Sequence, residues 1–125
     1  MSSQQRVLIV DDEPHLRLLY ETEFRRVGLE PLSAASAEQG LEFLLAMRPD
    51  LIVLDLRMPG MDGVEAMQRI LFHDSSIPIV INTAYGGYRD NFLTWAADAF
   101  VRKSSDVTEL LGTVLGLLRE HAVGA

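Results

Sequence analysis

The chain has 125 residues, a formal net charge of −7, 48% apolar residues and no cysteine. The length suits one domain with a real core, and the lack of cysteine excludes a disulfide framework and a thiolate metal site. The acidic charge argues against direct nucleic-acid binding, and no apolar stretch reaches the roughly 20 residues of a membrane span. We expect a cytoplasmic domain at residues 6–121, with short tails at 1–5 and 122–125, and no membrane contact.

The first half of the chain alternates between strand and helix patterns. Residues 6–10 form a short apolar run that ends in acids, which is typical of a strand buried on both faces. Pro14 suits the first turn of the helix that follows, and Gly28 ends this helix. Residues 30–34 form a weaker strand, and a capping box that begins at Ser36 predicts a second helix.

The second half repeats this alternation. Residues 50–55 read as another buried strand that ends in an acid, and a capping signature at Asp62 predicts the next helix. Two further strands are predicted at 77–82 and 98–102. The last helix is capped by Asp106.

Residues 84–97 carry the weakest pattern, because two adjacent glycines lower the helix propensity. We predict a short, marginal helix there, which is either a moving part of the domain or an ordinary helix with a poor pattern. Five strands that alternate with five helices indicate an α/β domain with a doubly wound parallel sheet. Ligands of such sheets bind at the carboxyl ends of the strands.

Acidic residues follow two of the predicted buried strands. Asp11 and Asp12 end the first strand, and Asp55 ends the third. If these strands are neighbours, the three carboxylates repel one another, so one takes a proton or a cation lies between them. Oxygen-only ligands favour a hard cation, with Mg²⁺ as the physiological choice and Mn²⁺ as a substitute.

Complementary groups follow the last two strands. Thr83 offers a hydroxyl donor and Lys103 an ammonium group. Each feature alone is weak, since an acid after a strand is commonly a helix cap and a Lys there is commonly solvated. Together with a divalent cation, the groups can neutralise the equatorial oxygens of a phosphoryl group. Their joint placement predicts a phosphoryl-transfer site.

These motifs resemble the receiver domain of two-component response regulators. The most specific is Asp-Leu-Arg-Met-Pro-Gly-Met-Asp-Gly at residues 55–63, and the other matches are residues 7–13, 83–84 and 100–103. The resemblance covers about residues 6–120. It implies the flavodoxin-like receiver fold, with five parallel strands in the order 2-1-3-4-5 and five helices.

The resemblance also implies a reaction. Asp55 would be the phosphoacceptor, and the donor would be a sensor histidine kinase or a histidine phosphotransfer protein. Asp12 and Asp55 would bind Mg²⁺ directly, and Asp11 directly or through a water. Arg57 would add its backbone carbonyl to the metal site. The domain would be a phosphoprotein of a phosphorelay that catalyses only its own phosphorylation and dephosphorylation, without being an enzyme for other substrates.

Three further residues gain roles from the resemblance. Lys103 would pair with Asp55 at rest and with the phosphoryl group afterwards. Thr83 would move to bond a phosphoryl oxygen, and Phe100 would be a switch aromatic that turns inward; the alternative for Phe100 is a plain core residue. The surface formed by the helix at 84–97, the last strand and the last helix would then act on a downstream effector protein or on a missing output domain.

One departure from the family pattern is Ser104, where most members have a proline. Because a cis bond before a residue other than proline is costly, we predict a trans peptide after Lys103. Two other functions stay open: an Mg²⁺-dependent hydrolase with an aspartyl-phosphate intermediate, and a pseudo-receiver that works without phosphorylation. Such hydrolases usually carry a second acid two residues after the nucleophile, and here that position is Arg57.

Overall fold

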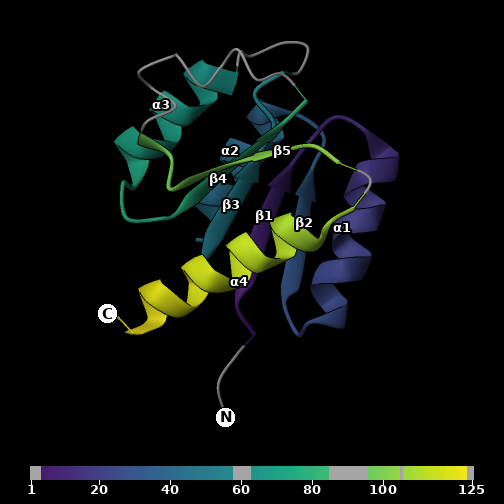
Figure 1. Ribbon diagram of the computed structural model, residues 1–125. Coiled ribbons are helices and arrows are strands. Elements are labelled where there is room, and N and C mark those ends of the chain that lie inside the picture. Colours follow the sequence, from purple (N-terminus) through teal and green to yellow (C-terminus); the bar gives the residue numbers. More distant parts are fainter. Residues whose placement is uncertain (1–3, 58–62, 85–95, 105, 124–125) are drawn as a thin grey trace.

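A computed structural model describes residues 4–57, 63–84, 96–104 and 106–123 of the chain (Figure 1). A five-stranded sheet forms its centre, and all strand pairs are parallel, in the order β2-β1-β3-β4-β5. The strands are β1 (Arg6–Val10), β2 (Glu30–Ala34), β3 (Leu51–Leu54), β4 (Ile79–Thr83) and β5 (Ala99–Arg102). The predicted doubly wound sheet and its strand order are confirmed.

Helices cover both faces of this sheet. The described helices are α1 (Pro14–Arg26), α2 (Ala37–Ala46), α3 (Gly63–His73) and α4 (Thr108–Val123). The cores place α1 and α4 on one face and α2 and α3 on the other. The marginal helix predicted at 84–97 falls mostly on 85–95, which lie outside the described residues. Within the described part of the chain, no helix is long and apolar enough to cross a membrane.

Local sequence signals set several element ends. Pro14 occupies the first turn of α1, and Gly28, just beyond this helix, has a φ of +89°, a conformation that favours glycine. The Ser36 hydroxyl caps α2 by accepting a hydrogen bond from the Gln39 N–H at 3.1 Å. The capping signature at Asp62 lies outside the described residues.

The last two strands differ slightly from their predicted bounds. β4 begins at Ile79 instead of residue 77, because Pro78 has no N–H for a regular ladder. β5 begins at Ala99 instead of residue 98. Asp98 still joins the start of β5 to β4, because its N–H donates to the Ile79 carbonyl and its carboxylate accepts from the Ile79 N–H, both at 2.9 Å. Asp106 caps α4 as predicted, by accepting from the Thr108 N–H at 2.9 Å.

Strand residues alternate between two apolar cores. Val7 and Ile9 of β1 pack on the face covered by α1 and α4, whereas Leu8 and Val10 pack on the face covered by α2 and α3. Val7, Leu8 and Ile9 are at most 1% exposed, and every residue of β3 is buried. A central strand buried on both sides has little freedom, so the residues that follow β1 and β3 are held in place by the core.

Candidate functional site

Three carboxylates converge at the carboxyl ends of β1 and β3. The Asp11 N–H donates to the Ala34 carbonyl at 3.1 Å, and the Asp55 N–H donates to the Val10 carbonyl at 3.0 Å, so both acids continue the strand ladder. One carboxylate oxygen from each of Asp11, Asp12 and Asp55 lies within 4.8 Å of the others. Asp11 and Asp55 are buried, and Asp12 is the more exposed of the three. The predicted convergence of these acids is confirmed.

The Lys103 ammonium group lies between these acids. Its Nζ atom is 2.9 Å from Asp55 Oδ2 and 2.9 Å from Asp11 Oδ2, and it is 3.6 Å from Glu13 Oε1. The Lys103 N–H donates to the Thr83 carbonyl at 3.0 Å, which fixes the base of the side chain at the end of β4. The predicted pairing of Lys103 with Asp55 is therefore present.

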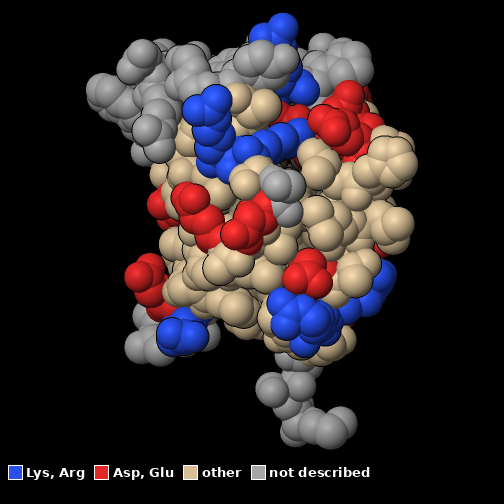
Figure 2. Space-filling model, turned by 45° about the vertical axis from the view of Figure 1, so that its right-hand side comes forward, with Lys and Arg blue, Asp and Glu red and all other residues tan. Residues whose placement is uncertain are grey.

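Burial and charge pull in opposite directions at this cluster. Burial raises the pKa of Asp11, although the Glu13 N–H and the Lys103 ammonium group lower it in part. For Lys103, burial alone would lower the pKa, but its close contacts with the charged Asp11 and Asp55 carboxylates outweigh it and raise the pKa. Figure 2 shows acidic and basic side chains next to each other at the upper edge of the molecule. Lys103 stays charged, and Asp11 bears the cost of burial.

The donor set at this edge fits a hard divalent cation. Asp11 Oδ1 accepts a hydrogen bond from the Glu13 N–H at 2.9 Å. Asp11 Oδ2 is buried and, despite its ion pair, has no partner with hydrogen-bond geometry in the described residues. Carboxylate oxygens are the ligands that Mg²⁺ prefers in proteins. A buried carboxylate oxygen with spare capacity, next to two more acids, is therefore suited to Mg²⁺.

The segment after β3 is fixed by two close contacts. Asp55 Oδ1 accepts a hydrogen bond from the Arg57 N–H at 3.0 Å, while the Arg57 side chain is exposed. The Gly63 N–H donates to the Leu56 carbonyl at 3.2 Å, and a Cβ on Gly63 would lie 2.3 Å from Leu56 Cα. Only glycine fits this approach. The predicted use of the Arg57 carbonyl as a metal ligand stays a prediction.

The two predicted switch residues lie on β4 and β5. Thr83 ends β4 and is fully buried. Phe100 is partly buried and packs against the core on the α2 and α3 face. The Lys103–Ser104 peptide bond is trans, as predicted. The switch roles of Thr83 and Phe100 remain predictions.

Sequence reasoning missed three polar residues around the cluster. Glu13 is a third acid near Lys103. The Asn82 side chain donates a hydrogen bond to the Tyr20 hydroxyl at 2.9 Å, and both residues are 2% exposed. A polar residue inside an apolar strand was the available signal for Asn82. No local pattern could have paired it with a tyrosine 62 residues earlier in the chain.

The comparison with protein families decides the identity of the domain. The sequence model described as the response regulator receiver domain matches residues 7–115. The chain belongs to this family. It is a receiver domain of the two-component type, and receiver domains are signalling switches.

Individual relatives agree with this assignment. Sporulation initiation phosphotransferase F of Bacillus subtilis (strain 168) is 40% identical over 82 residues, which are 66% of each chain. The response regulator TrrA of Thermotoga maritima, solved in complex with Mg²⁺-BeF, is 37% identical with a TM-score of 0.87, over 91% of this chain and 99% of that one. TrrA was also solved with the histidine kinase ThkA, with a TM-score of 0.85, 37% identity, and coverage of 92% and 99%.

Several curated relatives are longer than this chain. The chain spans about half the length of the ycf27 transcriptional regulators and of the response regulator MtrA from Mycolicibacterium smegmatis. The activity and partners of a whole protein that contains this receiver domain are therefore matters for proposal.

Proposed function

We propose that this receiver domain is switched by a phosphoryl group on Asp55, taken from the phosphohistidine of a sensor histidine kinase or phosphotransfer protein. An Asp55 carboxylate oxygen attacks phosphorus and forms a P–O bond, the P–N bond breaks, and its electron pair returns to the imidazole nitrogen. The observation that carries the proposal is the Lys103 ammonium group, 2.9 Å from both Asp55 and Asp11. It lies beside the acid that gains negative charge.

The neighbouring residues divide the remaining tasks. Asp11, Asp12, Asp55 and the Arg57 carbonyl hold Mg²⁺, which when bound neutralises phosphoryl oxygens. Mn²⁺ is the expected substitute because it accepts the same oxygen ligands. Lys103 leaves Asp11 to pair with the phosphoryl group. The buried Asp11 Oδ2 supports the cation, since its ion pair with Lys103 is released when Lys103 moves to the phosphoryl group.

Signal output follows from the change at β4 and β5. Thr83 moves toward a phosphoryl oxygen and Phe100 turns inward, which changes the surface formed by residues 84–97, β5 and α4. The recipient is a downstream effector protein or an output domain of a longer chain. The kinase seen with TrrA and the longer relatives support these partners. The proposed domain comprises residues 6–121 and is cytoplasmic. It binds neither nucleic acid nor a membrane directly, and it turns over no other substrates.

Phosphorylation by a small phosphodonor tests the proposal. The wild type, Asp55→Asn and the control Asp74→Asn are incubated with acetyl phosphate and Mg²⁺, and the modified fraction is read by intact mass spectrometry. Asp74 is a suitable control because it is an acid that pairs with Arg48, far along the sequence from the cluster. We expect modification of the wild type and of Asp74→Asn, and none of Asp55→Asn.

Three results would contradict the proposal. Modification that persists in Asp55→Asn would move the acceptor to another residue. No modification of the wild type, with acetyl phosphate or with a cognate kinase, would favour a pseudo-receiver. Continuous release of phosphate from many small phosphomonoesters would instead favour the hydrolase.

A further inference from the structure

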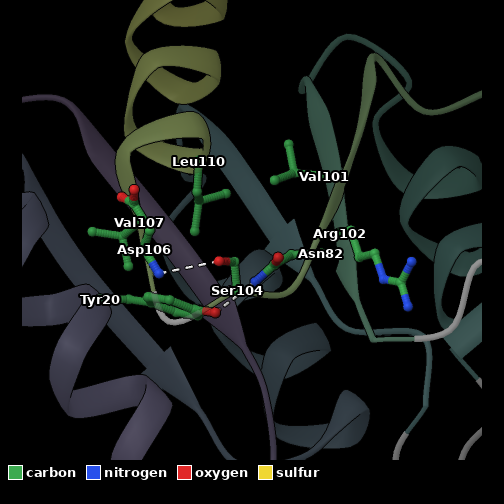
Figure 3. A pocket seen from close by; sticks show the side chains of 8 residues that line it. All are labelled: Tyr20, Asn82, Val101, Arg102, Ser104, Asp106, Val107 and Leu110. Atoms are coloured by element: carbon green, nitrogen blue, oxygen red, sulfur yellow. Dashed lines mark hydrogen bonds between the residues drawn. The ribbon is translucent and has the colours of Figure 1, made fainter.

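A buried polar pair lies beneath the charged cluster, on the face covered by α1 and α4. Residues of β4 alternate, so Asn82 shares the side of Val80, which belongs to that core, while Thr83 points to the opposite side. The Asn82 side chain meets the Tyr20 hydroxyl of α1 at 2.9 Å (Figure 3). This hydrogen bond joins the end of β4 to a helix that the proposed chemistry does not use.

The pair is within the electrostatic reach of the site. Burial raises the pKa of the Tyr20 phenol, the bond from Asn82 lowers it in part, and the charges of Asp11, Lys103 and Asp55 act on it as well. The phenol therefore stays protonated and neutral at physiological pH. Its oxygen can accept the bond from Asn82 without adding a charge to the cluster.

A small pocket borders both members of this pair. The pocket has a volume of about 10 Å³, enough for about one water molecule. Its lining includes Tyr20, Asn82, Ser104 and Leu110, and Figure 3 shows these side chains gathered where β4, the end of β5 and the start of α4 meet. The Asn82 side chain therefore borders a small space, and its bond to Tyr20 is a contact that fixes its orientation.

We propose that Tyr20 and Asn82 are a positioning pair that holds the end of β4 in its resting place and opposes the movement of Thr83. Asn82 and Thr83 are joined by one planar peptide, so a shift of the Thr83 backbone carries Asn82 with it. Thr83 also accepts the Lys103 N–H, so the same restraint reaches the Lys103 backbone. This inference rests on the proposed function, because it concerns how readily Thr83 moves when Asp55 is phosphorylated.

Beryllofluoride, a phosphoryl analogue, and Mg²⁺ alone are the two probes that test the pair. Mg²⁺ affinity depends on acids after β1 and β3, whereas beryllofluoride affinity also requires the ends of β4 and β5. The variants are Tyr20→Phe and the double variant Tyr20→Phe/Asn82→Leu. The double variant removes both polar partners, which keeps the fold close to neutral in stability. Thr22→Ala is the control, since it removes another α1 hydroxyl bond, to the Leu18 carbonyl.

We expect both variants to bind beryllofluoride about two- to tenfold more tightly at saturating Mg²⁺, the factor that one neutral hydrogen bond provides. Their affinity for Mg²⁺ alone, and both affinities of Thr22→Ala, should match the wild type by isothermal titration calorimetry. Unchanged or weaker beryllofluoride binding would overturn the proposal, as would an equal change in Mg²⁺ affinity, which indicates a general structural effect.

A measurement on the wild type needs no variant. When only Mg²⁺ is present, nuclear magnetic resonance should show the Asn82 side-chain amide protected from hydrogen exchange with solvent. After beryllofluoride is added, the same amide should be less protected. Protection that persists after beryllofluoride is added would contradict the proposal that the Asn82–Tyr20 hydrogen bond weakens when Thr83 moves. If the wild type does not bind beryllofluoride in an Asp55-dependent way, the proposed function fails. If it binds but the variants and the amide behave like controls, only the positioning pair fails.

Discussion

The ends of β1 and β3 differ from the ends of β4 and β5, although both pairs contribute to one site. β1 and β3 are inner strands, and their acids continue the ladder through backbone bonds. β5 is an edge strand, and it supplies a single long side chain, Lys103, that reaches back across the sheet to Asp11 and Asp55. The first pair thus fixes its acids at the place that we propose for a metal and a phosphoryl group, and the second pair contributes a long side chain that reaches this place from the edge of the sheet.

We call the ends of β1 and β3 the fixed half of the site and the ends of β4 and β5 the responsive half. Removing Lys103, which links these two halves, should have the largest effect on stability. In Lys103→Met, the buried carboxylates of Asp11 and Asp55 lose their counter-charge, so the free energy of unfolding in metal-free buffer should fall by about 3–5 kcal/mol. Arg102→Met is the matched control, because this exposed neighbour should change stability by less than about 0.5 kcal/mol. Urea unfolding measures both. Equal losses in the two variants would show that Lys103 does not hold the halves together.

A substitution at Gly63, which packs against the segment that follows Asp55, should have the next largest effect on stability. In Gly63→Ala, the new Cβ meets the Leu56 backbone, so we expect a loss of about 1–3 kcal/mol and slower phosphorylation of the adjacent Asp55. Gly112→Ala in α4 meets open space and should gain about 0.5–1 kcal/mol. Thermal unfolding and acetyl phosphate labelling of both variants check this. Normal labelling of Gly63→Ala would mean that the approach of these residues does not position Asp55.

Neutralising one acid of the fixed half should have the smallest effect and the opposite sign. Because the pKa of Asp11 is raised, the folded state binds this proton more tightly than the unfolded state. Ionised Asp11 therefore costs stability above its folded pKa, and the cost disappears as the pH falls below its ordinary value near 3.8. In metal-free buffer at neutral pH, Asp11→Asn should be more stable by about 1 kcal/mol.

The control for that variant is the metal itself. Saturating Mg²⁺ should stabilise the wild type more than Asp11→Asn, since a ligand that binds the folded state raises its stability. Unfolding curves at neutral and acid pH, with Mg²⁺ or a chelator, give all four comparisons. A variant that is less stable than the wild type without metal would contradict the assignment of the burial cost to Asp11.

The fixed half was also the part that the sequence predicted best. Runs such as residues 6–10 and 50–55 combine a buried-strand composition with terminal acids, so strand pairing alone brings the acids together. The starts of β4 and β5 were predicted less well. Pro78 lacks the N–H that a regular ladder needs, and the Asp98 side chain accepts the Ile79 N–H in place of a backbone carbonyl. Neither effect is visible in hydrophobic periodicity.

The Tyr20–Asn82 bond lay beyond prediction for a different reason. Tyr20 reads as one more apolar position on the buried side of α1, and its partner is 62 residues away. Only the packing of α1 against β4 across one face of the sheet brings the two together. Polar contacts of this kind depend on tertiary packing, whereas the acids depend mainly on strand order.

The position of Tyr20 also gives the domain a built-in spectroscopic reporter. Its buried ring stacks on Phe24 with centroids 6.4 Å apart, and the charges of Asp11, Asp55 and Lys103 act on its hydroxyl. A fluorine label on this ring would sense a change of charge at Asp55 without any dye on the surface. The proposed phosphorylation of Asp55 could then be followed in solution while the surface of the domain stays unmodified.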